Sequence, residues 1–180
     1  IASKLPSGFH VGINFSASHI TSPTFVQECL HYRDSFNRDD LNLVIEVTER
    51  EPLDVDEDLV QRLNILHENG FVIALDDFGM GYAGLRQLQH MKSVPVDILK
   101  IDKIFIDTLP EDASMVAAII QLGRSLNLKM VAEGVENKQQ YDWLKAEEVD
   151  VLQGFLFARA VPAEVFEQDY LGEEKSLLPG

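Results

Sequence analysis

The sequence predicts an α/β fold, a parallel β/α barrel, because short apolar runs recur along the chain and a longer segment with helical spacing follows each of them. The runs are rich in Val, Ile and Leu, as strands buried on both faces of a parallel sheet are. The predicted strands are His10–Phe15, Leu43–Val47, Val72–Leu75, Ile98–Ile101, Lys129–Ala132 and Val151–Phe157. The predicted helices are Thr24–Tyr32, Val55–Asn69, Tyr82–His90, Ala113–Leu126, Lys138–Glu147 and Pro162–Tyr170.

The length of the chain limits how much of a barrel it can form. Its 180 residues fall short of the roughly 250 residues typical of a complete eight-stranded barrel. Because six strands are visible and the first begins almost at once, we expect an eight-stranded parallel β/α barrel that lacks its first two strands. We expect one N-terminally incomplete domain at residues 1–170 and a C-terminal tail at 171–180. Unpaired sheet edges favour association of two copies, so a homodimer is expected.

The amino-acid composition restricts the binding partners and the cellular compartment that we expect for the chain. The net charge of −15 and the pI near 4.6 argue against a DNA or RNA duplex as a partner, because phosphate backbones are held mainly by Lys and Arg. The single cysteine, Cys29, excludes an internal disulfide and is predicted to be a buried apolar residue. No signal peptide and no apolar run of about 18 residues is found, so we expect a cytoplasmic domain, compatible with a parent protein anchored in the inner membrane.

Polar side chains stand at the carboxyl end of every predicted strand, which is where parallel β/α barrels carry their active sites. In chain order they are Asn14, Glu46, Asp76 with Asp77, Lys100 with Asp102, Glu133 with Glu136, and Gln153. Carboxylates this close repel one another unless a cation offsets them, so the pattern predicts a site for a hard divalent metal. Oxygen ligands favour Mg²⁺ or Mn²⁺ over zinc, and the adjacent Asp76 and Asp77 suit a two-metal arrangement.

Each of these residues, taken alone, also has an ordinary structural interpretation. An isolated acid after a strand is usually a helix N-cap or an exposed loop residue. Lys100 has an alternative as a salt-bridge partner among acids, and Gln153 as a hydrogen-bonded amide at a strand end. The five histidines show no shared ligand spacing and are predicted to be structural or surface residues.

Two classes of nucleotide-handling enzyme are excluded. The triplet Asp77-Phe78-Gly79 occurs in protein kinases, but neither a Gly-rich loop nor a catalytic-loop sequence accompanies it. A Walker-type sequence is also absent, which argues against an ATPase. The glycines of Gly79-Met80-Gly81 instead favour a mobile turn, a lid over the predicted metal site.

Six motifs in a fixed order carry a resemblance to a known family. They are Asn14-Phe15-Ser16-Ala17, Glu46-Val47-Thr48-Glu49, Asp76-Asp77-Phe78-Gly79, Leu99-Lys100-Ile101-Asp102, Ala132-Glu133-Gly134-Val135-Glu136 and Gln153-Gly154-Phe155-Leu156-Phe157. Together they resemble the EAL-domain cyclic-di-GMP phosphodiesterases of bacteria, from about residue 12 to residue 166. The resemblance implies a modified TIM (β/α)8 barrel, here without its first two strands. It also implies hydrolysis of one phosphodiester bond of cyclic-di-GMP to linear pGpG in second-messenger signalling, with Mg²⁺ or Mn²⁺ as cofactor.

The resemblance also implies a role for each residue of the motifs. Asn14, Glu46 and Asp76 resemble the ligands of one metal ion, and Asp76 and Asp77 those of a second. Lys100 would orient or activate the attacking water, and Glu133 resembles the candidate general base. The remaining residues are expected to brace the lid loop (Glu49) or to complete the network around metal, water and substrate (Asp102, Glu136 and Gln153). Phe155 and Phe157 are predicted to be barrel core rather than guanine-stacking rings.

Two departures from the family pattern leave an alternative open. The name-giving Glu-Ala-Leu segment, whose glutamate is a metal ligand in active relatives, is absent, so the isolated 180 residues are compatible with an inactive fragment. Met80 stands where the family usually has Thr. The alternative is a degenerate, catalytically inactive EAL domain that acts as a cyclic-di-GMP receptor or protein-interaction module. Either case is compatible with a sensory, GGDEF or membrane domain in the parent chain.

Overall fold

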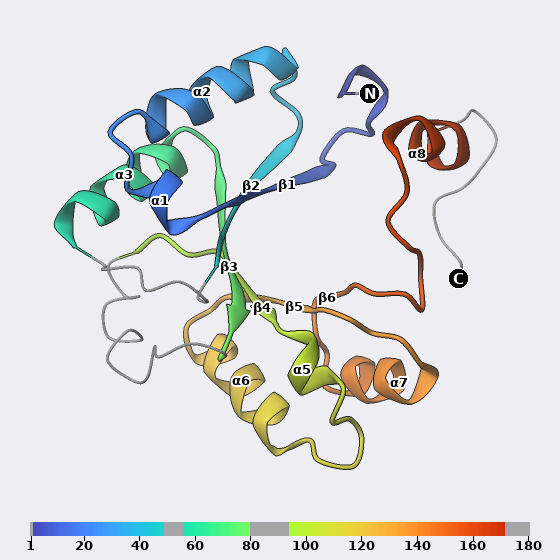
Figure 1. Cartoon of the computed structure of the whole chain (residues 1–180). Helices are drawn as coiled ribbons and strands as arrows, with labels where there is room; N and C mark the ends of the chain where they lie inside the picture. The colour runs from blue at the N-terminus through green and yellow to red at the C-terminus, as the bar shows by residue number, and fades with distance from the viewer. Residues whose placement is uncertain (1, 49–55, 80–93, 172–180) are drawn as a thin grey trace.

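The computed structural model describes residues 2–48, 56–79 and 94–171, and these form a curled parallel sheet with helices on its outside (Figure 1). Six strands pair in the order β1-β2-β3-β4-β5-β6, every neighbouring pair being parallel. They are β1 (His10–Phe15), β2 (Asn42–Thr48), β3 (Val72–Phe78), β4 (Ile98–Ile101), β5 (Lys129–Ala132) and β6 (Val151–Leu152). The helices are η1 (Ala2–Lys4), α1 (Ala17–Ile20), α2 (Phe25–Phe36), α3 (Glu57–Glu68), α5 (Lys103–Ile106), α6 (Ser114–Ser125), α7 (Lys138–Ala146) and α8 (Ala163–Tyr170).

The predicted elements agree with this architecture, with differences at their ends. β1, β4 and β5 have the predicted bounds, whereas β2 and β3 continue further toward their carboxyl ends. The four-residue helices α1 and α5 were not predicted, because a single turn is too short to show helical periodicity. The predicted helix Tyr82–His90 lies outside the described residues.

The predicted strand Val151–Phe157 is wrong over most of its length, because β6 ends at Leu152. The chain turns at Gly154, where the N–H of Phe157 donates to the Gly154 carbonyl at 3.1 Å. A Cβ at Gly154 would lie 2.3 Å from the backbone nitrogen of Val135, so this close passage requires glycine. The turn leaves Phe155 and Phe157 54% and 48% exposed, so their prediction as barrel core is also wrong.

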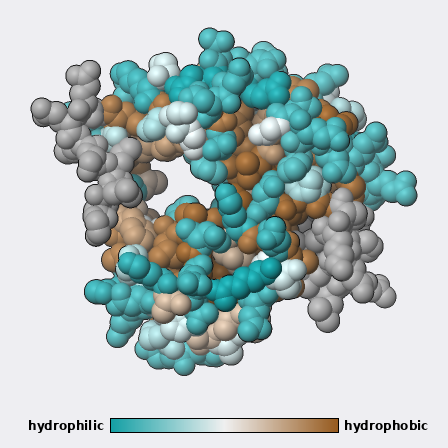
Figure 2. Space-filling view, turned by 180° about the vertical axis from the view of Figure 1, so that it is seen from behind, coloured by the Kyte–Doolittle hydropathy of each residue, from teal (hydrophilic) through white to brown (hydrophobic). Residues whose placement is uncertain are grey.

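Side chains on the two faces of the sheet form separate apolar clusters. The outward-facing positions pack against the helices, in one cluster around β1 to β3 and another around β4 to β6. The inward-facing positions form a smaller cluster of Val44, Ala74, Ile98 and Val131, one residue from each of four neighbouring strands. Figure 2 shows the hollow of the curl with hydrophobic residues along much of its border.

Four charged residues of the predicted site follow this apolar cluster, each at the next inward-facing position along the chain. Residues two apart on a strand point to the same face, so the inner cluster is followed at the carboxyl ends by a second layer on the same side. That layer consists of Glu46, Asp76, Lys100 and Glu133. The sheet therefore places an apolar floor directly beneath four charged side chains.

The helix after β6 packs against the opposite edge of the sheet. The ring of Phe166 in α8 meets that of Phe9 edge-on, with centroids 6.3 Å apart, and Lys4 pairs with Glu167. Phe9 immediately precedes β1, so α8 links the β6 side of the curl to the β1 side (Figure 1). None of the described helices combines the length and apolar character needed to cross a bilayer.

Burial of Cys29 on α2 predicts an unreactive thiol. Its side chain is 1% exposed, and burial, aided by Glu28, raises the thiol pKa to about 11. The folded chain should therefore react with a disulfide reagent such as DTNB at pH 8 at least about 100-fold more slowly than the urea-unfolded chain, because both access and thiolate fraction are low. Rapid reaction of the native protein would show that α2 does not pack as described.

Candidate active site

Lys100 is the centre of the charged layer. Its ammonium Nζ lies 2.7 Å from Glu46 Oε2, 3.1 Å from Asp76 Oδ1 and 2.8 Å from Glu133 Oε1. These contacts join β4 to β2, to β3 and to the carboxyl end of β5. The four side chains are between 9% and 20% exposed, so water screens their charges only weakly. One lysine thus holds three carboxylates from three other parts of the sheet.

This arrangement shifts the pKa values of both Lys100 and Glu133. Burial alone would lower the pKa of Lys100, but hydrogen bonds to Glu133 and Glu46 and attraction to their charges raise it above its ordinary value. Burial also raises the pKa of Glu133; Lys100 opposes that change, and the charges of Asp76 and Glu46 add to it. Lys100 is therefore a permanent cation, and Glu133 is a carboxylate with increased affinity for a proton.

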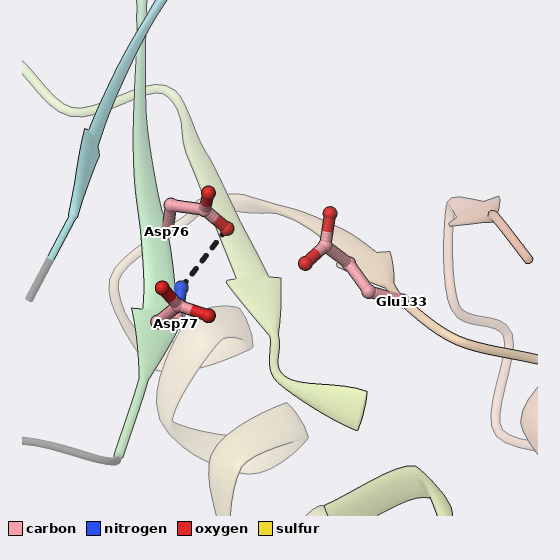
Figure 3. A group of neighbouring side chains, drawn as sticks. All are labelled: Asp76, Asp77 and Glu133. Atoms are coloured by element: carbon pink, nitrogen blue, oxygen red, sulfur yellow. Dashed lines mark hydrogen bonds between the residues drawn. The ribbon is translucent and has the colours of Figure 1, made fainter. Parts of the chain in front are cut away.

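A bulge in β3 brings a further carboxylate to the same place. In the pairing of β3 with β4, Leu75 faces Leu99 and Phe78 faces Ile101, so Asp76 and Asp77 together stand opposite one residue. Regular alternation would send these two neighbours to opposite faces of the sheet. Asp77 instead has a φ of 56°, and its N–H donates to Asp76 Oδ1 at 3.0 Å (Figure 3).

The result is a group of carboxylates close enough to share a cation. One oxygen each from Asp76, Asp77 and Glu133 lie within 4.8 Å of one another (Figure 3). Glu46 adds a fourth carboxylate. Three of the four, Glu46, Asp76 and Glu133, contact the ammonium of Lys100, so these five side chains carry an excess of three negative charges when all carboxylates are ionised. Hard oxygen ligands around such an excess fit a divalent cation, whose charge would offset it.

The other predicted site residues lie around this group in different settings. Asn14 is exposed and stands opposite Glu46 in the register of β1 with β2. Asp102 is 6% exposed and caps α5, accepting from Ile104 N–H at 2.8 Å. Glu136 is directed to Lys103 at 3.1 Å, and Gln153 is exposed, with its backbone bonded to Ala132 and Val135. Glu49 lies outside the described residues.

Two contacts of the site were not predicted from the sequence. The hydroxyl of Thr48 donates to Asp77 Oδ2 at 3.2 Å, so the last residue of β2 supports the bulged aspartate. Gln140 on α7 is 4% exposed and bonds to the backbone of the loop after β5. The spacing Asn137-x-x-Gln140 could have identified a capping box at the start of α7, which the structure contains.

A curled parallel sheet with a carboxylate group at its carboxyl ends defines the chain as a β/α half-barrel with a candidate divalent-metal site. A family model described as the EAL domain matches residues 1–160. The chain therefore belongs to the EAL domain family, and the resemblance found in its motifs is confirmed.

Known relatives show how closely the chain matches the family. The probable cyclic di-GMP phosphodiesterase PdeG of Escherichia coli (strain K12) is 59% identical over 164 residues, covering 89% of this chain and 32% of PdeG. The PaMucR phosphodiesterase in complex with c-di-GMP has a TM-score of 0.75 at 37% identity, covering 87% of this chain and 64% of that one. The manganese and cy-diGMP complex of Klebsiella pneumoniae BlrP1 has a TM-score of 0.71 at 29% identity, covering 83% and 38%. The chain thus spans less than two thirds of each.

The central position of Lys100 predicts that its replacement destabilises the chain. With EDTA present, Lys100→Met should lower the free energy of unfolding by about 3 kcal/mol, because it leaves partly buried carboxylates without their shared cation. Urea unfolding measures the change. Addition of Mn²⁺ should recover part of the loss, since a bound cation replaces the missing charge.

Lys103→Met is the matched control for that experiment. Lys103 pairs with Asp107 and Glu136 but is 44% exposed, so its replacement should cost less than about 1 kcal/mol. Equal stability of the wild type and Lys100→Met would contradict the description of Lys100 as the counter-charge of the carboxylates.

Proposed function

We propose that the domain to which this chain belongs hydrolyses one phosphodiester bond of cyclic-di-GMP to linear pGpG, with Mg²⁺ or Mn²⁺ held at the carboxylate group. The observation that carries the proposal is the convergence of Glu46, Asp76 and Glu133 on Lys100 at the carboxyl ends of the strands, with Asp77 beside Asp76 and Glu133. Family membership supports the substrate, since PdeG is by name a probable cyclic di-GMP phosphodiesterase and PaMucR is a phosphodiesterase in complex with c-di-GMP.

The chemistry of the donor set supports two divalent cations. Asp76 and Asp77 would hold the cations together with Glu46 and Asn14, and Glu133, one oxygen of which lies within 4.8 Å of an oxygen of each aspartate, would stand beside them. When bound, the cations would act as Lewis acids on the phosphodiester and make a water molecule a stronger nucleophile. They would also draw an anionic nucleotide to a chain whose net charge is −15 and which would otherwise repel it.

Lys100 and Glu133 would divide the remaining tasks. Glu133, whose pKa burial raises, would accept a proton at a carboxylate oxygen from the attacking water. Lys100 would keep its charge throughout and donate hydrogen bonds from Nζ, which orient Glu133 and the water. The apolar inner cluster beneath would keep bulk water from approaching the charged layer from below.

The test is hydrolysis of cyclic-di-GMP followed by chromatography of the product. We compare the 180-residue chain with a version extended to include the two upstream strands and the Glu-Ala-Leu segment of the family. Linear pGpG that forms with Mn²⁺ or Mg²⁺ and not with EDTA, from either version, supports the proposal. If either version binds the nucleotide but neither cleaves it, the proposal of an enzyme is wrong and a receptor for the nucleotide is the function.

A substitution at Glu133 separates chemistry from binding in whichever version is active. Glu133→Gln should lower kcat at least about 100-fold and change nucleotide affinity less than about threefold, because it removes the proton acceptor and keeps the shape. Glu164→Gln on α8, an exposed and distant position, is the matched control and should behave as wild type. Wild-type turnover in Glu133→Gln would refute the role given to this residue.

A further inference from the structure

Gln140 is a buried polar residue that the proposed chemistry does not use. Among the described residues, three polar or charged side chains count as buried: Lys100, Asp102 and Gln140. The first two stand at the end of β4, within the site. Gln140 lies on α7, on the outside of the sheet. Burying an amide is costly unless each of its polar atoms is bonded, so its partners matter.

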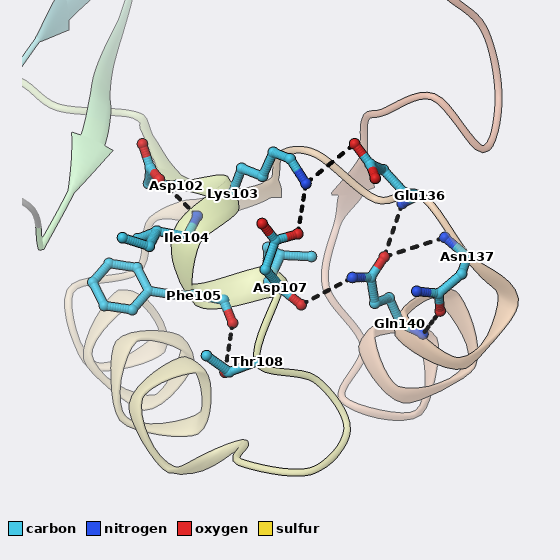
Figure 4. Close-up of polar contacts among 10 residues, drawn as sticks. Asp102, Lys103, Ile104, Phe105, Asp107, Thr108, Glu136, Asn137 and Gln140 are labelled. Carbon is cyan, nitrogen blue, oxygen red and sulfur yellow. Dashed lines mark hydrogen bonds and ion pairs between the residues drawn. The ribbon is translucent and has the colours of Figure 1, made fainter.

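The partners of Gln140 belong to two different loops at the mouth of the site (Figure 4). Its Oε1 accepts hydrogen bonds from the backbone N–H of Glu136 at 2.8 Å and of Asn137 at 3.2 Å. Its Nε2 donates to the carbonyl of Ile106 at 3.2 Å. The first two belong to the loop after β5, and Ile106 is the last residue of α5, after β4. A single amide therefore joins the loops that follow two adjacent strands.

The capping box at the start of α7 explains only part of this arrangement. Its reciprocal bonds join Asn137 and Gln140 and require nothing beyond α7. The bonds to Glu136 and Ile106 are additional, and the second of these crosses to another element. The bond to Ile106 needs the Nε2 donor, which a glutamate would lack, although a glutamate serves equally well at this position of a capping box.

A second set of contacts fastens the same two loops beside Gln140. Lys103 of α5 pairs with Glu136 at 3.1 Å and with Asp107 at 2.5 Å (Figure 4). The stem of Lys103 lies so close to Gly134 that a Cβ at Gly134 would be 2.4 Å from Lys103 Cγ. Val135 and Ile106, both 0% exposed, belong to the same apolar cluster. The loops are thus packed as one unit.

Both loops carry or adjoin a central residue of the charged layer. Glu133 comes three residues before Glu136, and its N–H donates to the Ile101 carbonyl at 3.1 Å. Lys100 is followed at once by Ile101, Asp102 and α5. We propose that Gln140 is a positioning residue: by joining the end of α5 to the loop after β5, it sets Glu133 against Lys100 and so maintains the geometry of the metal site. This inference rests on the metal site of the proposed function.

Two substitutions of Gln140 disrupt its hydrogen bonds to α5 and to the loop after β5 in different ways. Gln140→Met keeps the side-chain length and removes all three hydrogen bonds. Gln140→Glu keeps an acceptor for the two loop N–H groups but loses the donor to Ile106, whose carbonyl would then face a carboxylate oxygen. Both variants should therefore weaken Mn²⁺ binding, Gln140→Met by losing every side-chain hydrogen bond and Gln140→Glu by placing a buried carboxylate against the Ile106 carbonyl.

Two controls separate positioning from general loss of stability. Gln139→Met is the adjacent, exposed glutamine on the same helix and should behave as wild type. Leu144→Val shortens a fully buried side chain of α7 that bonds to neither loop, and it destabilises the helix through packing alone. All measurements are made well below the unfolding temperature of the least stable variant.

Mn²⁺ binding by isothermal titration calorimetry is the primary measurement. Gln140→Met should bind Mn²⁺ at least about 10-fold more weakly than the wild type, as loss of a residue that orients metal ligands does, whereas Leu144→Val should stay within about twofold. In an active version of the domain, kcat should fall more than KM rises. Wild-type affinity in a folded Gln140→Met, or equal losses in Gln140→Met and Leu144→Val, would overturn the inference.

A metal-free measurement keeps this inference distinct from the proposed function. If the wild type binds no Mn²⁺, the proposed metal site is wrong. The claim that Gln140 positions Glu133 is still tested by urea unfolding, in EDTA, of Gln140→Met, Glu133→Gln and the double variant. If Gln140 sets the position of Glu133, the two substitutions are coupled, and the double variant loses less stability than the two single losses added together. Additive losses would overturn the inference even where the fold is intact.

Discussion

The contact of one lysine with three carboxylates is the constraint on which the rest of the site depends. Glu46, Asp76 and Glu133 come from different strands, and at these distances their charges would repel one another strongly without Lys100. The apolar floor of Val44, Ala74, Ile98 and Val131 increases the effect, because charges above an apolar layer are weakly screened. The fold thus holds a concentrated negative charge that one internal cation only partly offsets, and this is what makes the mouth suitable for divalent metals.

Much of this architecture could be predicted, because in a parallel β/α fold the spacing of apolar residues along the chain indicates which segments are strands and which are helices. Apolar runs of four to seven residues indicate the strands, and the rule that carboxyl ends meet at one edge of a parallel sheet predicts that Glu46, Asp76, Lys100 and Glu133 lie together. The structure confirms that these four residues meet. The motifs likewise indicated the EAL family, which the family match confirms over residues 1–160.

Other features depend on individual contacts that no regular spacing of residues in the sequence indicates. The bulge that brings Asp77 beside Asp76 needs a positive φ at a non-glycine residue, and only its pairing with β4 reveals it. The run Val151–Phe157 has the composition of a buried strand, but the close passage of Gly154 against Val135 turns the chain after Leu152 and exposes the two phenylalanines. The sequence does not indicate the link made by Gln140, because its partners are backbone groups 4 and 34 residues away.

In the proposed function, cations and substrate phosphates meet at the carboxylate group, and the buried lysine and the loops after β4 and β5 hold that group in shape. The most direct test is the position of the metal itself, from anomalous diffraction of crystals of the chain soaked in Mn²⁺. The account predicts anomalous peaks between Asp76, Asp77 and Glu133, beside Lys100. Strong peaks elsewhere on the acidic surface, with none at this group, would contradict it.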